Sequence, residues 1–126
     1  MGPVKIEIDA KQANILLKAI EVYTRLNSGQ LHIALEFLED KNLSWEEMQI
    51  LETHFNGIVF PELHGAYYGI RQCHENVQIA FDMKQVIRHQ LWKERGSKVD
   101  YTVDAYVTPV NEYPLVKVEG DEYHNN

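Results

Sequence analysis

The side chains best suited to bind a small molecule lie late in the chain, between positions 81 and 92. One set is spaced by four, three and four residues: Phe81, Gln85, Arg88 and Trp92. A helix brings residues at this spacing to one side, and His89 lies beside them. Aromatic rings stack on flat heterocycles, an arginine fork binds phosphate or carboxylate, and glutamine both donates and accepts hydrogen bonds. The set therefore favours a site for a small anionic, nucleotide-like ligand.

Three further residues are candidates for completing this site. Tyr67, Tyr68 and Arg71 lie in or beside a segment with glycines at positions 65 and 69, which predicts an ordered loop. Arg71 also comes shortly before the next predicted helix, and helix N-termini favour anions. A second subunit is expected to contribute, because one small domain offers little concave surface.

Two other interpretations of the set between positions 81 and 92 remain open. Aromatic residues at helical spacing commonly pack in a core. The same residue types, tryptophan and arginine above all, are enriched where proteins bind one another. Ligand binding, core packing and protein contact therefore all fit these residues.

No sequence motif fixes a reaction. The six histidines and the single cysteine form neither HExxH nor a pair at zinc spacing. Cys73 and His74 are adjacent, and neighbouring side chains seldom form a productive nucleophile–base pair. The groups that keep an enzyme open as a third interpretation are Asp82, Arg88, His89 and Cys73. We therefore expect a non-catalytic protein without a metal or cofactor.

Composition narrows the setting and the partners. The chain has 126 residues, a net charge of −7 and one cysteine, which fits the reducing cytoplasm. Its negative charge disfavours duplex nucleic acid, and no segment approaches the roughly 20 apolar residues of a membrane span. The first residues do not form a signal peptide. An acidic surface suits docking on a basic protein, and the residues that would form it are Glu36, Glu39, Asp40, Glu46, Glu47 and Glu52.

The elements that must position these residues are mostly helical. The chain is predicted to be a single domain over 1–126, with a disordered tail at about 121–126. Apolar periodicity predicts helices over about 9–26, 30–39, 44–55 and 74–95. The expected starts are two capping boxes, Asp9 with Gln12 and Ser44 with Glu47. Gly57 and Gly96 are expected to end the third and fourth helices.

The two ends of the chain carry strand patterns. Apolar residues alternate with charged ones at 4–8 and at 115–119, and strand-type residues occupy 101–107. The simplest arrangement pairs the first and last of these segments. The expected fold is therefore α+β: about four helices with a small antiparallel sheet formed by the N-terminal and C-terminal strands.

The helix over 74–95 is expected to lie between two layers. Its broad apolar side comprises Ile79, Ala80, Met83, Val86, Ile87, Gln90 and Leu91. The set that begins at Phe81 lies on another side and would meet the rest of the monomer or another subunit.

Part of the chain resembles a family of small proteins from tailed bacteriophages and prophages. The resemblance rests on Ala80-Phe81-Asp82, on Gln85-Val86-Ile87-Arg88-His89 with Leu91, and on the preceding Tyr67-Tyr68-Gly69-Ile70. It extends from about position 6 to position 92. The family implies a setting, the cytoplasm of an infected bacterium, and no catalytic or binding roles for particular residues.

The resemblance and the residues between positions 81 and 92 together imply a phage-type, non-catalytic binding protein. In the implied setting, such a protein acts against host defence as a homo-oligomeric sponge that sequesters a nucleotide-derived ligand. The alternative is an inhibitor that occludes a host protein through its acidic surface.

Overall fold

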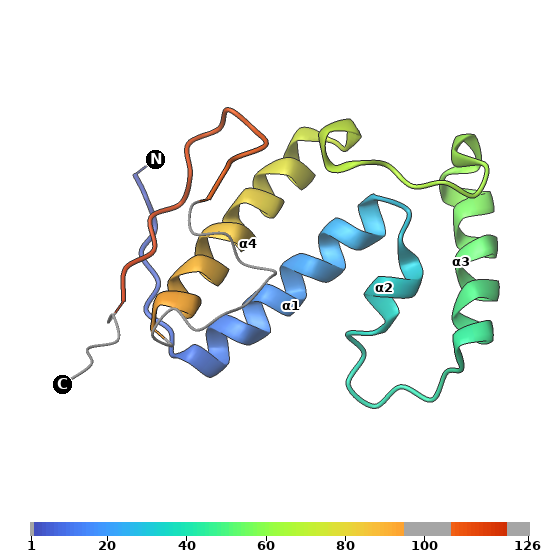
Figure 1. Ribbon diagram of the computed structural model, residues 1–126, viewed down its shortest axis with the longest axis horizontal. Coiled ribbons are helices and arrows are strands. Elements are labelled where there is room, and N and C mark those ends of the chain that lie inside the picture. Colours follow the sequence, from blue (N-terminus) through green and yellow to red (C-terminus); the bar gives the residue numbers. More distant parts are fainter. Residues whose placement is uncertain (1, 95–106, 121–126) are drawn as a thin grey trace.

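The computed structural model describes residues 2–94 and 107–120. Its helices, in chain order, are α1 (Ala10–Asn27), α2 (Leu31–Leu35), α3 (Trp45–Val59), η1 (Pro61–Leu63), η2 (Ile70–Gln72) and α4 (Glu75–Glu94). α1 and α4 lie side by side, α2 packs against the C-terminal half of α1, and α3 stands beyond α2 (Figure 1). None of the described helices combines the length and the apolarity that crossing a bilayer requires.

The two predicted capping boxes are confirmed. Asp9 Oδ1 accepts a hydrogen bond of 2.8 Å from the Gln12 N–H, and Gln12 Oε1 accepts one of 3.0 Å from the Asp9 N–H. Ser44 and Glu47 make the equivalent pair at 3.1 and 2.9 Å. Each pair satisfies N–H groups that have no partner within the helix. Local chemistry therefore sets the first residues of α1 and α3.

Two predicted helix ends are wrong. The second helix covers only Leu31–Leu35, not 30–39. α3 continues through Gly57 to Val59, and the Phe60 N–H still bonds to the Asn56 carbonyl at 2.8 Å. The left-handed residues that follow α3 are His64 (φ 48°) and Gly65 (φ 88°). The end predicted at Gly96 lies outside the described residues.

The predicted sheet is also wrong: within 2–94 and 107–120 the chain is helical, without a β-strand. The N-terminal segment alternates as a strand does, but Val4 is 81% exposed and Ile6 76% exposed. A strand pattern specifies a sheet only where one face is buried, and here none is. Most of the predicted segment 101–107 and the tail at 121–126 lie outside the described residues.

The C-terminal segment 107–120 is attached to α4 through side chains. The buried carboxylate of Asp82 accepts hydrogen bonds from the N–H groups of Val110 at 2.9 Å and Asn111 at 3.1 Å. Asn111 Nδ2 also donates to Gln78 Oε1 at 2.9 Å. Asp82 therefore satisfies the backbone of a turn and holds the segment 107–120 to α4, whereas the sequence predicted that a strand at 115–119 would attach this part of the chain through a sheet.

The buried apolar core of the described residues is small. It consists of Ala13, Ala34, Met48, Cys73, Val77 and Ile87. Within α4 the buried residues are Val77, Asp82, Lys84 and Ile87. Of the predicted apolar side, Ile87 alone is buried, and the other members are partly exposed. α4 is covered on two sides, by α1 and by the segment that Asp82 holds, which explains why its covered positions do not form one stripe.

Candidate ligand-binding pocket

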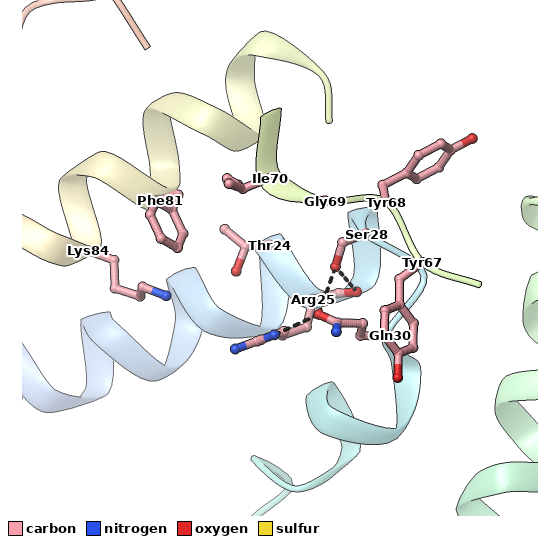
Figure 2. A pocket seen from close by; sticks show the side chains of 10 residues that line it. All are labelled: Thr24, Arg25, Ser28, Gln30, Tyr67, Tyr68, Gly69, Ile70, Phe81 and Lys84. Carbon is pink, nitrogen blue, oxygen red and sulfur yellow. Dashed lines mark hydrogen bonds between the residues drawn. The ribbon is translucent and has the colours of Figure 1, made fainter. Parts of the chain in front are cut away.

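A pocket of about 370 Å³ lies where the C-terminal end of α1 meets the segment before η2 and the middle of α4. Its lining residues are Thr24, Arg25, Ser28, Gln30, Tyr67, Tyr68, Gly69, Ile70, Phe81 and Lys84 (Figure 2). Phe81 stands on the α4 side and Tyr67 at the opposite end, with polar groups of α1 and of the turn after it between them. The volume falls in the range of small-molecule sites.

The turn after α1 shapes one wall of this pocket. Gly29 has φ +82°, a backbone conformation that favours glycine, and a Cβ there would lie 2.8 Å from Leu63 Cδ1, so the leucine side chain would have to shift. The buried Asn56 donates to the Gly29 carbonyl at 2.8 Å, and the Tyr68 N–H donates to the Ser28 carbonyl at 3.0 Å. These bonds fasten α3 and the tyrosine-bearing segment to the end of α1.

Two of the lining residues, Arg25 and Lys84, belong to an ion-pair network. Lys84 is 4% exposed, forms an ion pair with Glu21, and places its Nζ 4.4 Å from the centre of the Phe81 ring. Arg25 Nε donates to the other carboxylate oxygen of Glu21 at 3.0 Å. Two cations therefore share one carboxylate, which gives these three residues a net charge of +1 within a chain of −7.

The network perturbs the ionisation of both partners. Burial raises the pKa of Glu21, but the hydrogen bonds and charges of Lys84 and Arg25 outweigh burial and hold this pKa below its ordinary value. Burial lowers the pKa of Lys84, and the contact with Glu21 opposes this only in part. The positive charges of Arg25 and Arg88 lower the pKa of Lys84 further. Arg25 and Lys84 thus repel one another across the single carboxylate that they share.

At the polar edge of the pocket, the side-chain oxygen of Gln30 is the shared hydrogen-bond acceptor. Arg25 Nη1 donates to Gln30 Oε1 at 2.6 Å, and Ser28 Oγ lies 3.2 Å from the same oxygen and 3.1 Å from the Arg25 carbonyl. Figure 2 shows the Gln30 amide directed toward Arg25 and Ser28. The guanidinium has five donors, and its contacts with Glu21 and Gln30 use one on Nε and one on Nη1.

The structure brings together three of the predicted site residues: Phe81, Tyr67 and Tyr68 line the pocket. The Tyr68 hydroxyl is turned outward, where it bonds to Glu62, and this bond raises the pKa of Tyr68. Figure 2 shows the Tyr68 ring directed away from the other lining side chains. That these residues bind a ligand stays a prediction.

The other predicted site residues do not line the pocket. Arg88 Nη1 donates to Gln85 Oε1 at 3.3 Å, and the rings of His89 and Trp92 lie 5.5 Å apart, all further along α4. Arg71 is exposed on η2, and its carbonyl accepts from Gln78 Nε2 at 3.2 Å. Phe81 therefore lines the pocket, while the later members of its predicted set lie further along α4.

Sequence reasoning missed the two pocket cations. Lys84 follows Phe81 by three residues, so helical spacing alone places it near that ring. It went unnoticed because lysine is rarely buried. Arg25 and Glu21 are spaced as an i, i+4 pair, but no local pattern indicates that the end of α1 meets α4.

No protein-family model, curated protein or solved structure matches this chain. Across the described residues, His, Cys, Asp and Glu side chains do not gather in groups of three or more that could hold a metal ion. The function of the chain must therefore be inferred from the pocket. Two cations and two aromatic residues, Phe81 and Tyr67, line it on a helical framework.

Proposed function

We propose that this is a non-catalytic binding protein whose pocket holds a small anionic ligand with a flat ring, of the nucleotide-derived class. One observation carries the proposal: Arg25 and Lys84, which share the carboxylate of Glu21, both line a pocket with Phe81 at one end and Tyr67 at the other. A pocket lined by two cations is unexpected in a chain of net charge −7, and an anionic ligand would account for it.

The lining suggests how such a ligand is held. Its phosphate would take the Arg25 donors that Glu21 and Gln30 do not use, as a charge-assisted contact. Its ring would stack on Tyr67 or Phe81, and such stacking is worth about 1–3 kcal/mol per base. The Gln30 amide and the Ser28 hydroxyl offer hydrogen bonds that distinguish one ring from another.

The biological setting is the second part of the proposal. The resemblance of the α4 segment to small phage proteins supports a role in the cytoplasm of an infected bacterium. A protein that binds a nucleotide second messenger without converting it lowers the free concentration of that messenger. We propose that this chain acts as such a sponge, as a homo-oligomer, against host defence.

Isothermal titration calorimetry tests the ligand class. The probes are linear nucleotides, cyclic mono- and dinucleotides and cyclic ADP-ribose isomers, with an uncharged nucleoside as the control for charge. We expect heat from at least one charged probe and a ligand that is recovered unchanged. Arg25→Gln should weaken binding at least tenfold, about 1.4 kcal/mol.

The matched control is Arg71→Gln, which removes an exposed arginine outside the pocket and should leave affinity within twofold. The proposal fails if every probe is silent, or if the Arg71 variant loses binding while the Arg25 variant keeps it. Turnover of the probe would favour the enzyme interpretation.

Occlusion of a host protein is the second candidate, favoured by the start of α3. Glu46 and Glu47 are exposed there, beside Trp45, which is 57% exposed. Aromatic and acidic groups together suit a basic partner surface. Binding of a purified basic candidate that survives Arg25→Gln but is lost on charge reversal at Glu46 would support occlusion over ligand capture.

A further inference from the structure

α3 has few contacts within its own chain. It is 15 residues long, yet it packs on the five-residue α2 and on η1, and among the described helices it contacts neither α1 nor α4. Figure 1 shows α3 beyond α2, on the far side from α4. A helix covered over so little of its surface exposes the remainder to solvent or to a partner.

The covered side of α3 is well defined. Met48, Glu52 and Asn56 follow one another at intervals of four residues. Met48 and Asn56 are buried, and Glu52 accepts a 2.8 Å hydrogen bond from the His32 N–H of α2 and also contacts the His32 ring. These contacts fix the rotation of α3 and determine which side it exposes.

The exposed side of α3 carries two apolar residues seven positions apart. Leu51 is 43% exposed and Ile58 is 82% exposed, with the exposed His54 between them. Ile50, 57% exposed, lies next to this line. Intervals of three and four residues are the spacing by which one helix packs along another.

α1 exposes the same pattern. Leu16 is 38% exposed and Tyr23 is 43% exposed, with the exposed Ala19 between them. Ile15, 58% exposed, stands immediately before Leu16. The two helices therefore share one arrangement: an isoleucine, the apolar residue that follows it, and the positions three and seven residues after that. The buried residues of α1, Ala13 and Thr24, are not part of it.

The charges beside the two patterns are opposite. Lys11 precedes Ile15 by four residues, and Glu46 precedes Ile50 by the same interval. Lys11 and Glu46 are both exposed. Lys18, on the same side of α1 as Lys11, contacts Glu39 at 3.6 Å within its own chain, so Lys11 is the cation that faces a partner. Complementary charge favours α1 against α3 over either helix against its own copy.

We propose that the exposed side of α3 packs against the exposed side of α1 in a second copy of this chain. The two sides cannot meet within one chain, because α2 lies between the helices. A stable interface buries about 1,200–2,000 Å² in total, more than a single helix pair supplies. Two-fold symmetry makes the α1–α3 contact twice, which suits a closed dimer. This interface does not depend on the pocket ligand.

Sedimentation velocity without ligand tests the dimer. The wild-type chain should sediment as a dimer that dissociates on dilution, and Ile58→Lys should shift it to monomer. The matched control is Ile6→Lys, a comparably exposed isoleucine outside both helices, which should leave the dimer unchanged. Circular dichroism of each variant establishes that its helices persist.

A charge exchange tests which surfaces meet. Lys11→Glu alone and Glu46→Lys alone should each weaken the dimer, since each sets like charges against one another. An equimolar mixture of the two variants should recover it, because both contacts in the mixed dimer then pair opposite charges. A wild-type monomer at every concentration overturns the proposal. So does a dimer that either single reversal leaves intact, or a mixture that stays monomeric.

Discussion

The two halves of this molecule differ in what they bury: one buries charged side chains, and the other leaves apolar side chains exposed. Between α1 and α4 the chain buries charge, with Lys84 and Glu21 paired beneath the pocket. Around α2 and α3 it leaves apolar side chains uncovered, and Ile58 is 82% exposed. Buried charge must be paired, whereas exposed apolar surface commonly marks a contact with another molecule. The pocket proposed for a ligand thus lies in the first half, whereas the proposed contact with a second copy joins α3 of the second half to the exposed side of α1.

The largest expected effect comes from breaking the buried pair. Glu21→Gln leaves the ammonium of Lys84, 4% exposed, without its counterion. Removing one partner of such a pair typically lowers the free energy of unfolding by about 3–5 kcal/mol. Urea denaturation followed by circular dichroism measures this loss.

The control for that change is Glu39→Gln. It removes an ion pair of similar chemistry, with Lys18 at 3.6 Å, whose side chains are 79% and 52% exposed. An exposed pair of this kind contributes less than about 1 kcal/mol. Equal losses for the two variants would contradict a buried charge network between α1 and α4.

The same pair predicts how stability depends on pH. The pKa of Glu21 in the folded chain lies below its ordinary value of 4.5, so the folded carboxyl binds fewer protons than the unfolded one between those two pKa values. Stability from Glu21 is therefore complete above its unfolded pKa and is lost as pH falls through its folded pKa.

Unfolding measured at successive pH values from neutral to acidic checks this window. The slope should be shallower in Glu21→Gln. Part of it should persist, because the pKa values of Glu47 and Glu62 are also lowered, by hydrogen bonds with Ser44 and Tyr68 respectively. A stability that rises on acidification would contradict the prediction.

A smaller effect distinguishes two glycines, one in each half. Gly29→Ala places a side chain at φ +82° and 2.8 Å from Leu63 Cδ1. The left-handed conformation alone costs roughly 1–2 kcal/mol. Because Gly29 shapes the pocket wall, ligand affinity should fall as well.

Gly57→Ala should have the opposite sign. Gly57 lies within α3, and a Cβ there meets nothing within 4 Å. Alanine in a helix interior is favoured over glycine by roughly 0.5–1 kcal/mol. Thermal unfolding of both variants checks the pair. Stabilisation by Gly29→Ala would refute the strained turn at the pocket.

How much of this arrangement the sequence predicts depends on how local each feature is. The capping boxes at Asp9 and Ser44 involve residues three positions apart, and both predicted starts are correct. The alternating segment at 4–8 looked like a strand, but pairing depends on a distant partner, and Val4 and Ile6 bury no face. The second helix is shorter than its pattern because its last predicted turn finds no layer to pack on, and Leu38 is 51% exposed.

The pocket follows the same rule. Phe81, Tyr67 and Tyr68 are conspicuous by residue type, and the structure places all three at one cavity. Arg25 lies at the pocket because the C-terminal end of α1 meets α4, a tertiary contact that no local sequence pattern indicates. Asp82 shows the converse: its chemistry suggested acid–base catalysis, while its two backbone N–H partners give it a structural task.

The last comparison concerns the caps of α1 and α3, whose loss is expected to be small. Asp9→Ala and Ser44→Ala each remove one side of a capping box and should cost about 1 kcal/mol.

Hydrogen exchange should separate them. α1 packs along α4, so loss of Asp9 should lower protection across both helices together. α3 rests on α2 and η1, so loss of Ser44 should raise exchange in α3 while α4 keeps its protection. If a second copy covers α3, raising the protein concentration should restore that protection, and in Glu46→Lys it should not. Uniform exchange across all helices after Ser44→Ala would mean that α3 opens only with the whole chain, and the contrast between the two halves would not hold.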